Sequence, residues 1–254
     1  MADPSYLYGV NAIRAALERS PERIRELWCD SRRQDPRVRA LLEEAGRVGV
    51  RAQQATRDTL DRLCGGALHQ GVVARADAPR TLDEGDLAEL LDRLSEPAFL
   101  LVLDGIQDPH NLGACLRSAD AAGVHALVSP RDRACGLTPA ARKVASGAAE
   151  TVPFVQVTNL ARTLRELKAR GIWLVGTAGE AERSVFETDL TGPLAVVVGA
   201  EGSGLRRLTR EACDHLVSLP MRGTVESLNV SVTAGVCLYE ALRQRGIEMG
   251  ARPD

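Results

Sequence analysis

Aromatic side chains and lysine are scarce in this chain of 254 residues. Phe, Trp and Tyr make up 3% of it, and Lys143 and Lys168 are its only lysines. With so few rings, we do not expect a platform of stacked aromatic side chains of the kind that single-strand binders use. The net charge of -2 and the isoelectric point near 6.1 give no overall attraction for a polyanion. Any contact with nucleic acid therefore has to rest on local clusters of arginine.

The cysteines form no recognisable metal-binding pattern. They contain no C-x-x-C pair and are scattered along the chain, as Cys29, Cys64, Cys115, Cys135, Cys213 and Cys237. We therefore expect no metal site, and a reduced cytoplasmic protein is the simplest interpretation. No apolar run approaches the roughly 20 residues that a membrane-spanning helix needs, and the first residues lack the pattern of a secretory signal. We expect no membrane partner.

The first third of the chain predicts a small α/β domain over residues 1–76. Its apolar spacing predicts helices at 11–18, 36–47 and 56–63, and strands at 24–29 and 69–74. The acidic stretch 77–97 contains Pro79 and the apolar spacing of one amphipathic helix at 82–94. We interpret this stretch as a linker with a helical segment.

Residues 98–254 predict a larger α/β domain with a parallel sheet. Strands are expected at 99–103, 126–129, 172–176, 194–198 and 216–219, and helices at 112–122, 158–170, 209–213 and 228–243. Continuous apolar strands such as Leu100 to Leu103 suit a parallel sheet that is covered on both faces. Open sheets of this kind bind ligands at the carboxyl ends of their strands, so the loops there are the candidate site.

Three of these loops carry small polar side chains and glycines. The first leads from Asp104 to Asn111, which stands at the expected N-cap of the next helix, and Arg117 follows two turns later. The second is Gly199-Ala200-Glu201-Gly202-Ser203-Gly204, and the third contains Ser227 and Asn229. Each loop by itself has a structural explanation as a turn or a helix cap. A carboxylate among glycines suits a ligand with positive charge or donor groups better than a phosphate.

Taken together, the three loops resemble the three sequence motifs of the SpoU (TrmH) branch of the SPOUT RNA methyltransferases. The matching stretches are Asp108-Pro109-His110-Asn111-Leu112-Gly113 with Arg117, the glycine-rich loop 199–204, and Ser227-Leu228-Asn229-Val230-Ser231. Residues 1–76, with Tyr8-Gly9 and His69-Gln70-Gly71, resemble the substrate-binding domain of its bacterial members. The resemblance implies an L30e-like first domain, a deep trefoil knot in the second, a homodimer, S-adenosylmethionine as methyl donor and no metal.

The resemblance also implies roles for individual residues. The catalytic surface would consist of Asn111, Arg117, Glu201, Ser227 and Asn229, and the methyl donor would lie near Thr177, Gly199, Leu219 and Leu228. The arginine matched by Arg117 has been proposed as the general base, yet a guanidinium stays protonated up to a pKa above about 12. We therefore expect Arg117 first to hold the target phosphate or the developing alkoxide, and only second to act as the base.

Within the branch, residues 111–123 and 142–150 are most similar to a subgroup that 2′-O-methylates a guanosine in the peptidyl-transferase loop of large-subunit ribosomal RNA. A 2′-O-ribose methyltransferase of transfer RNA and a catalytically silent RNA-binding protein are the alternatives. A Rossmann-type oxidoreductase is disfavoured because no G-x-G-x-x-G turn follows the first strand. Basic residues adjoin the predicted loops and could line a track for RNA phosphates: Arg131, Arg133, Arg142 and Lys143, then Arg206, Arg207 and Arg210, and finally Arg222.

Overall fold

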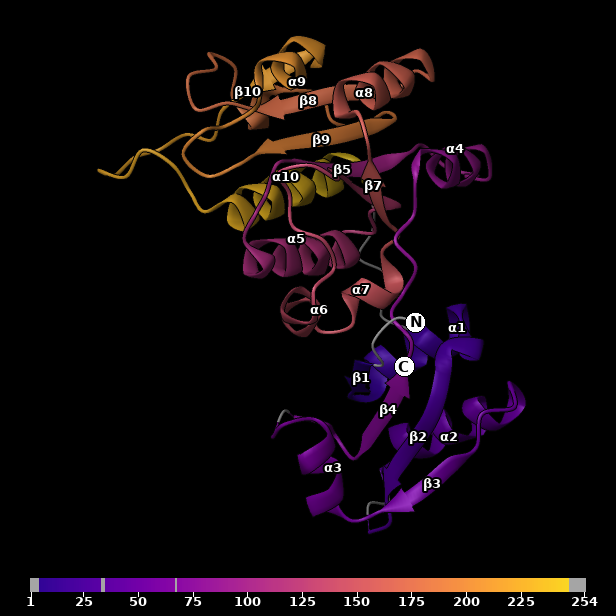
Figure 1. Ribbon diagram of the computed structural model, residues 1–254. Coiled ribbons are helices and arrows are strands. Elements are labelled where there is room, and N and C mark those ends of the chain that lie inside the picture. The colour runs from indigo at the N-terminus through magenta and orange to yellow at the C-terminus, as the bar shows by residue number, and fades with distance from the viewer. Residues whose placement is uncertain (1–4, 33–34, 67, 247–254) are drawn as a thin grey trace. The chain divides into compact units, whose positions relative to one another are not determined.

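The computed structural model describes residues 5–32, 35–66 and 68–246 (Figure 1). The chain forms two compact units. The first contains the residues up to Arg80 together with Ser146–Thr151, and the second contains Thr81–Ala145 and the residues from Val152 onward. The domain limits expected from the sequence stay a prediction, and their outermost parts, 1–4 and 247–254, lie outside the described residues.

The first unit is a four-stranded sheet with helices packed against it. Its strands lie in the order β1 (Ser5–Tyr8), β4 (Val72–Ala76), β2 (Ile24–Asp30) and β3 (Ala52–Ala55). Its helices are α1 (Val10–Arg19), α2 (Pro36–Arg47), α3 (Arg57–Leu63) and α7 (Ala148–Thr151). Asp35 caps α2 by accepting a hydrogen bond from the backbone N–H of Arg37. The apolar sides of α1 and α2 bury Ile13, Leu17 and Leu41 against the sheet residues Leu27 and Val72.

The second unit is built on a six-stranded sheet in which every strand pair is parallel. The order is β10 (His215–Val217), β8 (Trp173–Thr177), β9 (Leu194–Gly199), β5 (Phe99–Asp104), β6 (Ala126–Pro130) and β7 (Phe154–Val157). The helices are α4 (Glu84–Asp92), α5 (Pro109–Ala121), α6 (Pro139–Ala145), α8 (Leu160–Ala169), α9 (Arg207–Ala212) and α10 (Val230–Gln244). This confirms the predicted α/β class with a parallel-sheet domain, and the knot stays a prediction.

Helices cover both faces of this sheet, as continuous apolar strands require. On one face, Leu87 of α4 and Leu160, Leu164 and Leu167 of α8 pack on alternate strand residues such as Val102. On the other face, α5 and α10 lie side by side below β5 and β9 in Figure 1. The strands β5 and β9 are completely buried between these layers.

The parallel arrangement puts the candidate loops at one edge. β5 and β9 are neighbours, and their register pairs Asp104 with Gly199, the last residue of each strand. The loops that precede α5 and α9 therefore begin next to each other. The sequence did not predict β1, β3, β7, α6 or α7, because these elements have four to seven residues and show little apolar periodicity.

Candidate active site

The amide of Asn229 joins the three loops. Its side chain caps α10, with Oδ1 accepting hydrogen bonds from the Ser231 backbone N–H at 2.9 Å and from the Ser231 hydroxyl at 2.6 Å. The other end of the amide, Nδ2, donates to Asn111 Oδ1 at 2.9 Å and to Glu201 Oε1 at 2.6 Å. Three side chains that lie 28 to 118 residues apart in the sequence therefore form one hydrogen-bonded group.

Asn111 reaches this group from inside α5 rather than from its cap. The helix begins at Pro109, and Asp108 is the N-cap, accepting a hydrogen bond from the His110 backbone N–H at 3.0 Å. The expectation that Asn111 caps the helix is wrong, because Pro109 already provides a preformed first turn behind an aspartate cap. Asn111 instead lies in the first turn, 9% exposed, with its amide turned toward Asn229.

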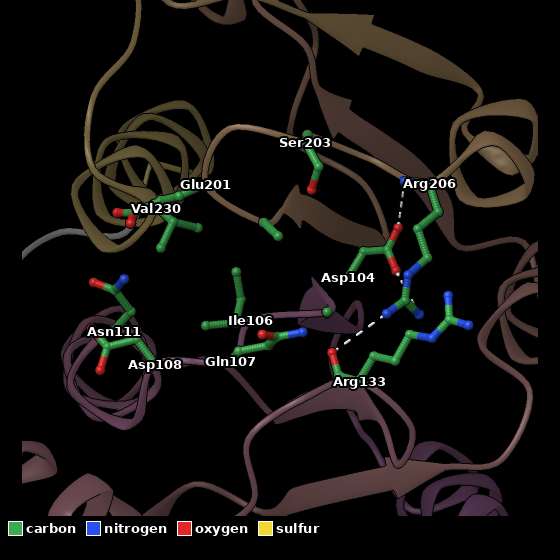
Figure 2. Close-up of a pocket in the computed structure, with 13 residues that line it drawn as sticks. Asp104, Ile106, Gln107, Asp108, Asn111, Arg133, Glu201, Ser203, Arg206 and Val230 are labelled. Carbon is green, nitrogen blue, oxygen red and sulfur yellow. Dashed lines mark hydrogen bonds and ion pairs between the residues drawn. The ribbon is translucent and has the colours of Figure 1, made fainter.

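A cleft of about 430 Å³ opens beside this group at the carboxyl edge of the sheet (Figure 2). Asn111 and Glu201 line one end of it, and Asp104 and Arg206 line the other. Its remaining polar side chains are Gln107, Asp108, Arg133 and Ser203, and Ile106 and Val230 give it apolar walls. A cleft of this size at the ends of parallel strands suits a nucleotide-sized ligand.

Asp104 closes strand β5 and is buried, with 1% of its surface exposed. Its Oδ2 accepts a hydrogen bond from the Arg206 backbone N–H at 2.8 Å, and its Oδ1 lies 3.5 Å from the Arg206 guanidinium. A buried carboxylate is costly unless it is paired, so this pair fixes the start of α9 beside the cleft. The loop motifs do not single out Asp104 as a site residue, although a carboxylate that ends an apolar strand is a signal that could have identified it.

Arg117 and Ser227 are not part of the hydrogen-bonded group. Arg117 is exposed on α5, and Ser227 is exposed in the loop before α10. Within the described part of the chain, neither side chain forms a hydrogen bond or an ion pair. Their predicted catalytic roles stay predictions.

Three of the residues expected near the methyl donor lie at or just beyond the ends of three adjacent strands. Thr177 ends β8, Gly199 ends β9, and Leu219 lies two residues beyond β10. The Thr177 hydroxyl donates a hydrogen bond to the Val197 carbonyl at 3.5 Å, so it faces its own sheet. Leu228 is 37% exposed in the loop before α10. Because the strands are parallel, these backbone segments share one edge, and their contact with a donor stays a prediction.

The buried thiols of this unit are poor nucleophiles. Burial raises the pKa of Cys115 and of Cys237 to about 12, and it is also the main cause that raises the pKa of Cys213 to about 12. A thiol that stays protonated neither attacks a substrate nor ligates a metal. In the ranges that the structure describes, no group of three His, Cys, Asp or Glu side chains is placed to hold a metal ion.

A parallel sheet with three meeting loops, preceded in the chain by a small α/β unit, is an arrangement that this protein shares with a class of RNA-modifying enzymes. Residues 98–239 match the SpoU rRNA methylase family, and residues 6–82 match the substrate-binding domain of RNA 2′-O ribose methyltransferases. The chain belongs to the SpoU rRNA methylase family.

Individual relatives and solved structures are similar to this chain over most of its length. The chain is 55% identical to the 23S rRNA (guanosine-2′-O-)-methyltransferase RlmB of Yersinia pestis over 95% of its own length and 98% of the relative's. RlmB of Escherichia coli K12 is also 55% identical, over 94% and 98% of the two chains. Among solved structures, the SpoU methyltransferase AviRb of Streptomyces viridochromogenes, in complex with AdoMet, has a TM-score of 0.74 at 31% identity and covers 94% of this chain and 90% of its own.

No described helix is long and apolar enough to cross a membrane.

Proposed function

We infer that the protein transfers a methyl group from S-adenosylmethionine to the ribose 2′-oxygen of a guanosine in 23S ribosomal RNA. The observation that carries this inference is the hydrogen-bonded group of Asn111, Glu201 and Asn229, one residue from each family motif, beside a nucleotide-sized cleft. The similarity to RlmB over almost the entire length of both chains supports the substrate. As the target we propose a guanosine of the peptidyl-transferase loop.

S-adenosylmethionine would supply an electrophilic methyl group on a sulfonium. Its fit to this chain rests on the three loop backbones that follow β8, β9 and β10, near Thr177, Gly199 and Leu219. Backbone N–H and C=O groups at this edge of the sheet suit the polar ends of the donor. Leu228 would add an apolar contact, and the Glu201 carboxylate would favour the positive sulfonium.

The acceptor is a neutral hydroxyl, so the site must align it, help to remove its proton and stabilise charge on oxygen. We propose that the Asn111, Glu201 and Asn229 group holds the ribose, with Ser227 as an additional donor. Arg117 would hold the target phosphate or stabilise the alkoxide, because its guanidinium has no partner among the described residues.

We also propose that the active protein is a homodimer. Exposed apolar side chains follow one another along α10 and the loop before it, with Leu228, Val232 and Tyr239 37%, 49% and 49% exposed. α10 packs beside α5, which carries Arg117, so a second copy on this face would approach the Arg117 guanidinium. We propose as well that the second unit contains the trefoil knot that the family implies. The proposed location of the protein is the cytoplasm, where ribosomes are assembled.

A transfer RNA methyltransferase fits the comparisons less well. The TrmH/SpoU tRNA-modifying enzyme of A. aeolicus is 32% identical but covers only 64% of this chain, with a TM-score of 0.54. The RlmB relatives cover at least 94%, and thus include the first unit. Since residues 6–82 match a substrate-binding domain, a relative that includes them is the better guide to the substrate.

The test is a comparison of ribose-methylation maps of ribosomal and transfer RNA from cells with and without the gene. We expect one 2′-O-methylguanosine to disappear from 23S rRNA and no change in transfer RNA. Plasmid-borne wild-type protein should restore that methyl group, and the Asn229→Asp variant should restore little of it. Loss of a transfer RNA methyl group, or no change in either RNA, would contradict the proposal.

A further inference from the structure

A second cleft adjoins the one already described. It has a volume of about 390 Å³ and extends over the beginnings of α8 and α9, where Thr158, Asn159 and Thr209 line it. Asp104, Arg133 and Arg206 line both clefts. The two clefts therefore meet at these three residues, so a ligand long enough to occupy both must pass over them.

The guanidinium of Arg206 is held in place at this junction. The buried Asp104 carboxylate lies 3.5 Å from Nη1, and Nη2 donates a hydrogen bond to the Arg133 carbonyl at 3.4 Å. Gly105, with φ of 84°, lies directly against the group, since a Cβ there would approach Nη2 to 2.7 Å. A flexible side chain fixed in this way loses little entropy when it binds a ligand.

Arg133 enters the junction from the opposite loop. Its φ of 54° is in the left-handed region, which is unfavourable by about 1–3 kcal/mol for a residue other than glycine. The loop is anchored by the Cys135 backbone N–H, which donates to the Ile106 carbonyl at 2.7 Å. In the described ranges, no carboxylate pairs with the Arg133 guanidinium, and its side chain extends beside that of Arg206 (Figure 2).

Among the described residues, the buried Asp104 is the only carboxylate that pairs with either of the two guanidinium groups at the junction. Asp132 also lines the second cleft, but in the part of the chain that the structure describes no ion pair joins it to Arg133 or Arg206. Two guanidinium groups side by side at the meeting point of two clefts match a phosphodiester, which has two non-bridging oxygens and one negative charge. We propose that Arg133 and Arg206 clamp the phosphate that joins the target nucleotide, in the first cleft, to its neighbour in the second. This assignment rests on the proposed function and specifies how the enzyme holds its RNA.

The test uses an RNA fragment that contains the target loop, in its native form or with one neutral methylphosphonate on either side of the target guanosine. Full-length wild-type protein should bind one of the two modified fragments about tenfold more weakly than the native fragment, because a charge-assisted contact is lost. The Arg133→Ala, Arg206→Ala double variant should bind the native fragment at least tenfold more weakly, yet lose nothing further on the modified one. Its slope of log affinity against log salt should be smaller by roughly 0.7–0.9 for each phosphate contact removed.

Controls separate the clamp from general charge loss and from the proposed function. Arg165→Ala removes an exposed arginine from α8 outside both clefts and should bind RNA as the wild type does. Arg206→Lys keeps the charge but loses the planar fork, so it should restore only part of the affinity. S-adenosylmethionine affinity, measured by calorimetry, should be equal in all variants.

The clamp would be overturned if the double variant bound RNA with wild-type affinity. It would also be overturned if the wild type and the double variant lost the same affinity when the modified fragment replaced the native one. Weaker donor binding with unchanged RNA binding would do the same, because the two arginines would then hold the donor carboxylate. By contrast, a wild-type protein that fails to methylate ribosomal RNA from cells lacking the gene would contradict the proposed function, whatever the binding data show.

Discussion

Replacing Asn229 with aspartate should separate the role of this residue in the site from its role in the helix. A carboxylate has nearly the shape of the amide and is an equally good N-cap, so the contact to the Ser231 backbone N–H survives. What disappears is the Nδ2 donor that bridges Asn111 and Glu201. In its place, a second negative oxygen would face Glu201 Oε1 across a contact that is now 2.6 Å.

The expected magnitude follows from the bonds that are lost. The hydrogen bond to the neutral Asn111 oxygen contributes about 1 kcal/mol, and the one to the Glu201 carboxylate contributes about 1.5 kcal/mol, the lower limit for charged acceptors because both partners are exposed. Asn229→Asp should therefore lower the free energy of unfolding by about 2.5 kcal/mol, plus the repulsion of the two carboxylates. Asn229→Ala also loses the cap, which contributes about 1 kcal/mol more.

The methylation rate should fall by more than the loss in the free energy of unfolding alone would explain. The two carboxylates cannot remain in contact, so the loop after β9, which carries Glu201, and the loop before α10 will separate. A displacement of about 1 Å at a reacting group can reduce the rate about 100-fold. The assay is transfer of a radioactive methyl group to 23S rRNA from cells that lack the gene, well below the melting temperature of each variant. Asn229→Ser, which retains a capping hydroxyl but reaches neither partner, serves as the uncharged control.

Two results would refute this reasoning. If Asn229→Asp methylates at a rate within a fewfold of wild type, the hydrogen-bonded group has no part in holding the ribose. If Asn229→Asp and Asn229→Ala are equally active and only stability differs, the residue acts solely as a helix cap.

Three further predictions concern single residues. Arg117→Ala should abolish methylation and leave the calorimetric affinity for S-adenosylmethionine nearly intact; near-normal turnover would defeat its assignment to the catalytic surface. Gly199→Ala should lower the melting temperature and the methylation rate, because a Cβ there would come within 2.1 Å of the neighbouring loop backbone, and such overpacking costs about 1–3 kcal/mol or more. Gly192→Ala, with nothing within 4 Å of the added Cβ, is its control, and an equal effect in both would contradict the argument. Hydrogen bonds from the Thr158 side chain and backbone lower the pKa of the Glu84 carboxyl from 4.5 to about 2. Since the pKa is lower in the folded state, this stabilisation is present above pH 4.5 and is lost as the pH falls toward 2, so the melting temperatures of wild type and Glu84→Gln should converge over that interval.

The sequence predicted the elements with strong periodicity well. The helix over 36–47 has the predicted limits, and the strands over 99–103 and 194–198 extend by one residue each. These segments have long apolar faces or continuous apolar runs, so their periodicity predicts the element without knowledge of its neighbours. The failures are the short elements, such as β3, whose residues Ala52-Gln53-Gln54-Ala55 become a strand only because β2 lies beside them.

The candidate site was predictable as a set of loops but not as a geometry. The motif residues Asn111, Glu201 and Asn229 could be named from their pattern, yet nothing local in the sequence shows that a single amide connects them. The residues that anchor the loops were harder to find. In the sequence, Asp104 is only the first residue of the loop after the predicted strand 99–103. Its role as an anchor becomes visible only when its partner, Arg206, lies beside it.

One structural relation places both the hydrogen-bonded group of Asn111, Glu201 and Asn229 and the proposed phosphate clamp. The pairing of β5 with β9 sets Asp104 opposite Gly199. From these two positions, the chain reaches Asn111 and Glu201 on one side of the cleft, and Asp104 meets Arg206 on the other. A slip of one residue in this register would turn every side chain of one strand to the opposite face and separate both pairs at once. The continuous burial of β5 and β9 opposes such a slip. The apolar core of the sheet therefore fixes the distance between the hydrogen-bonded group, proposed to hold the ribose, and the proposed phosphate clamp.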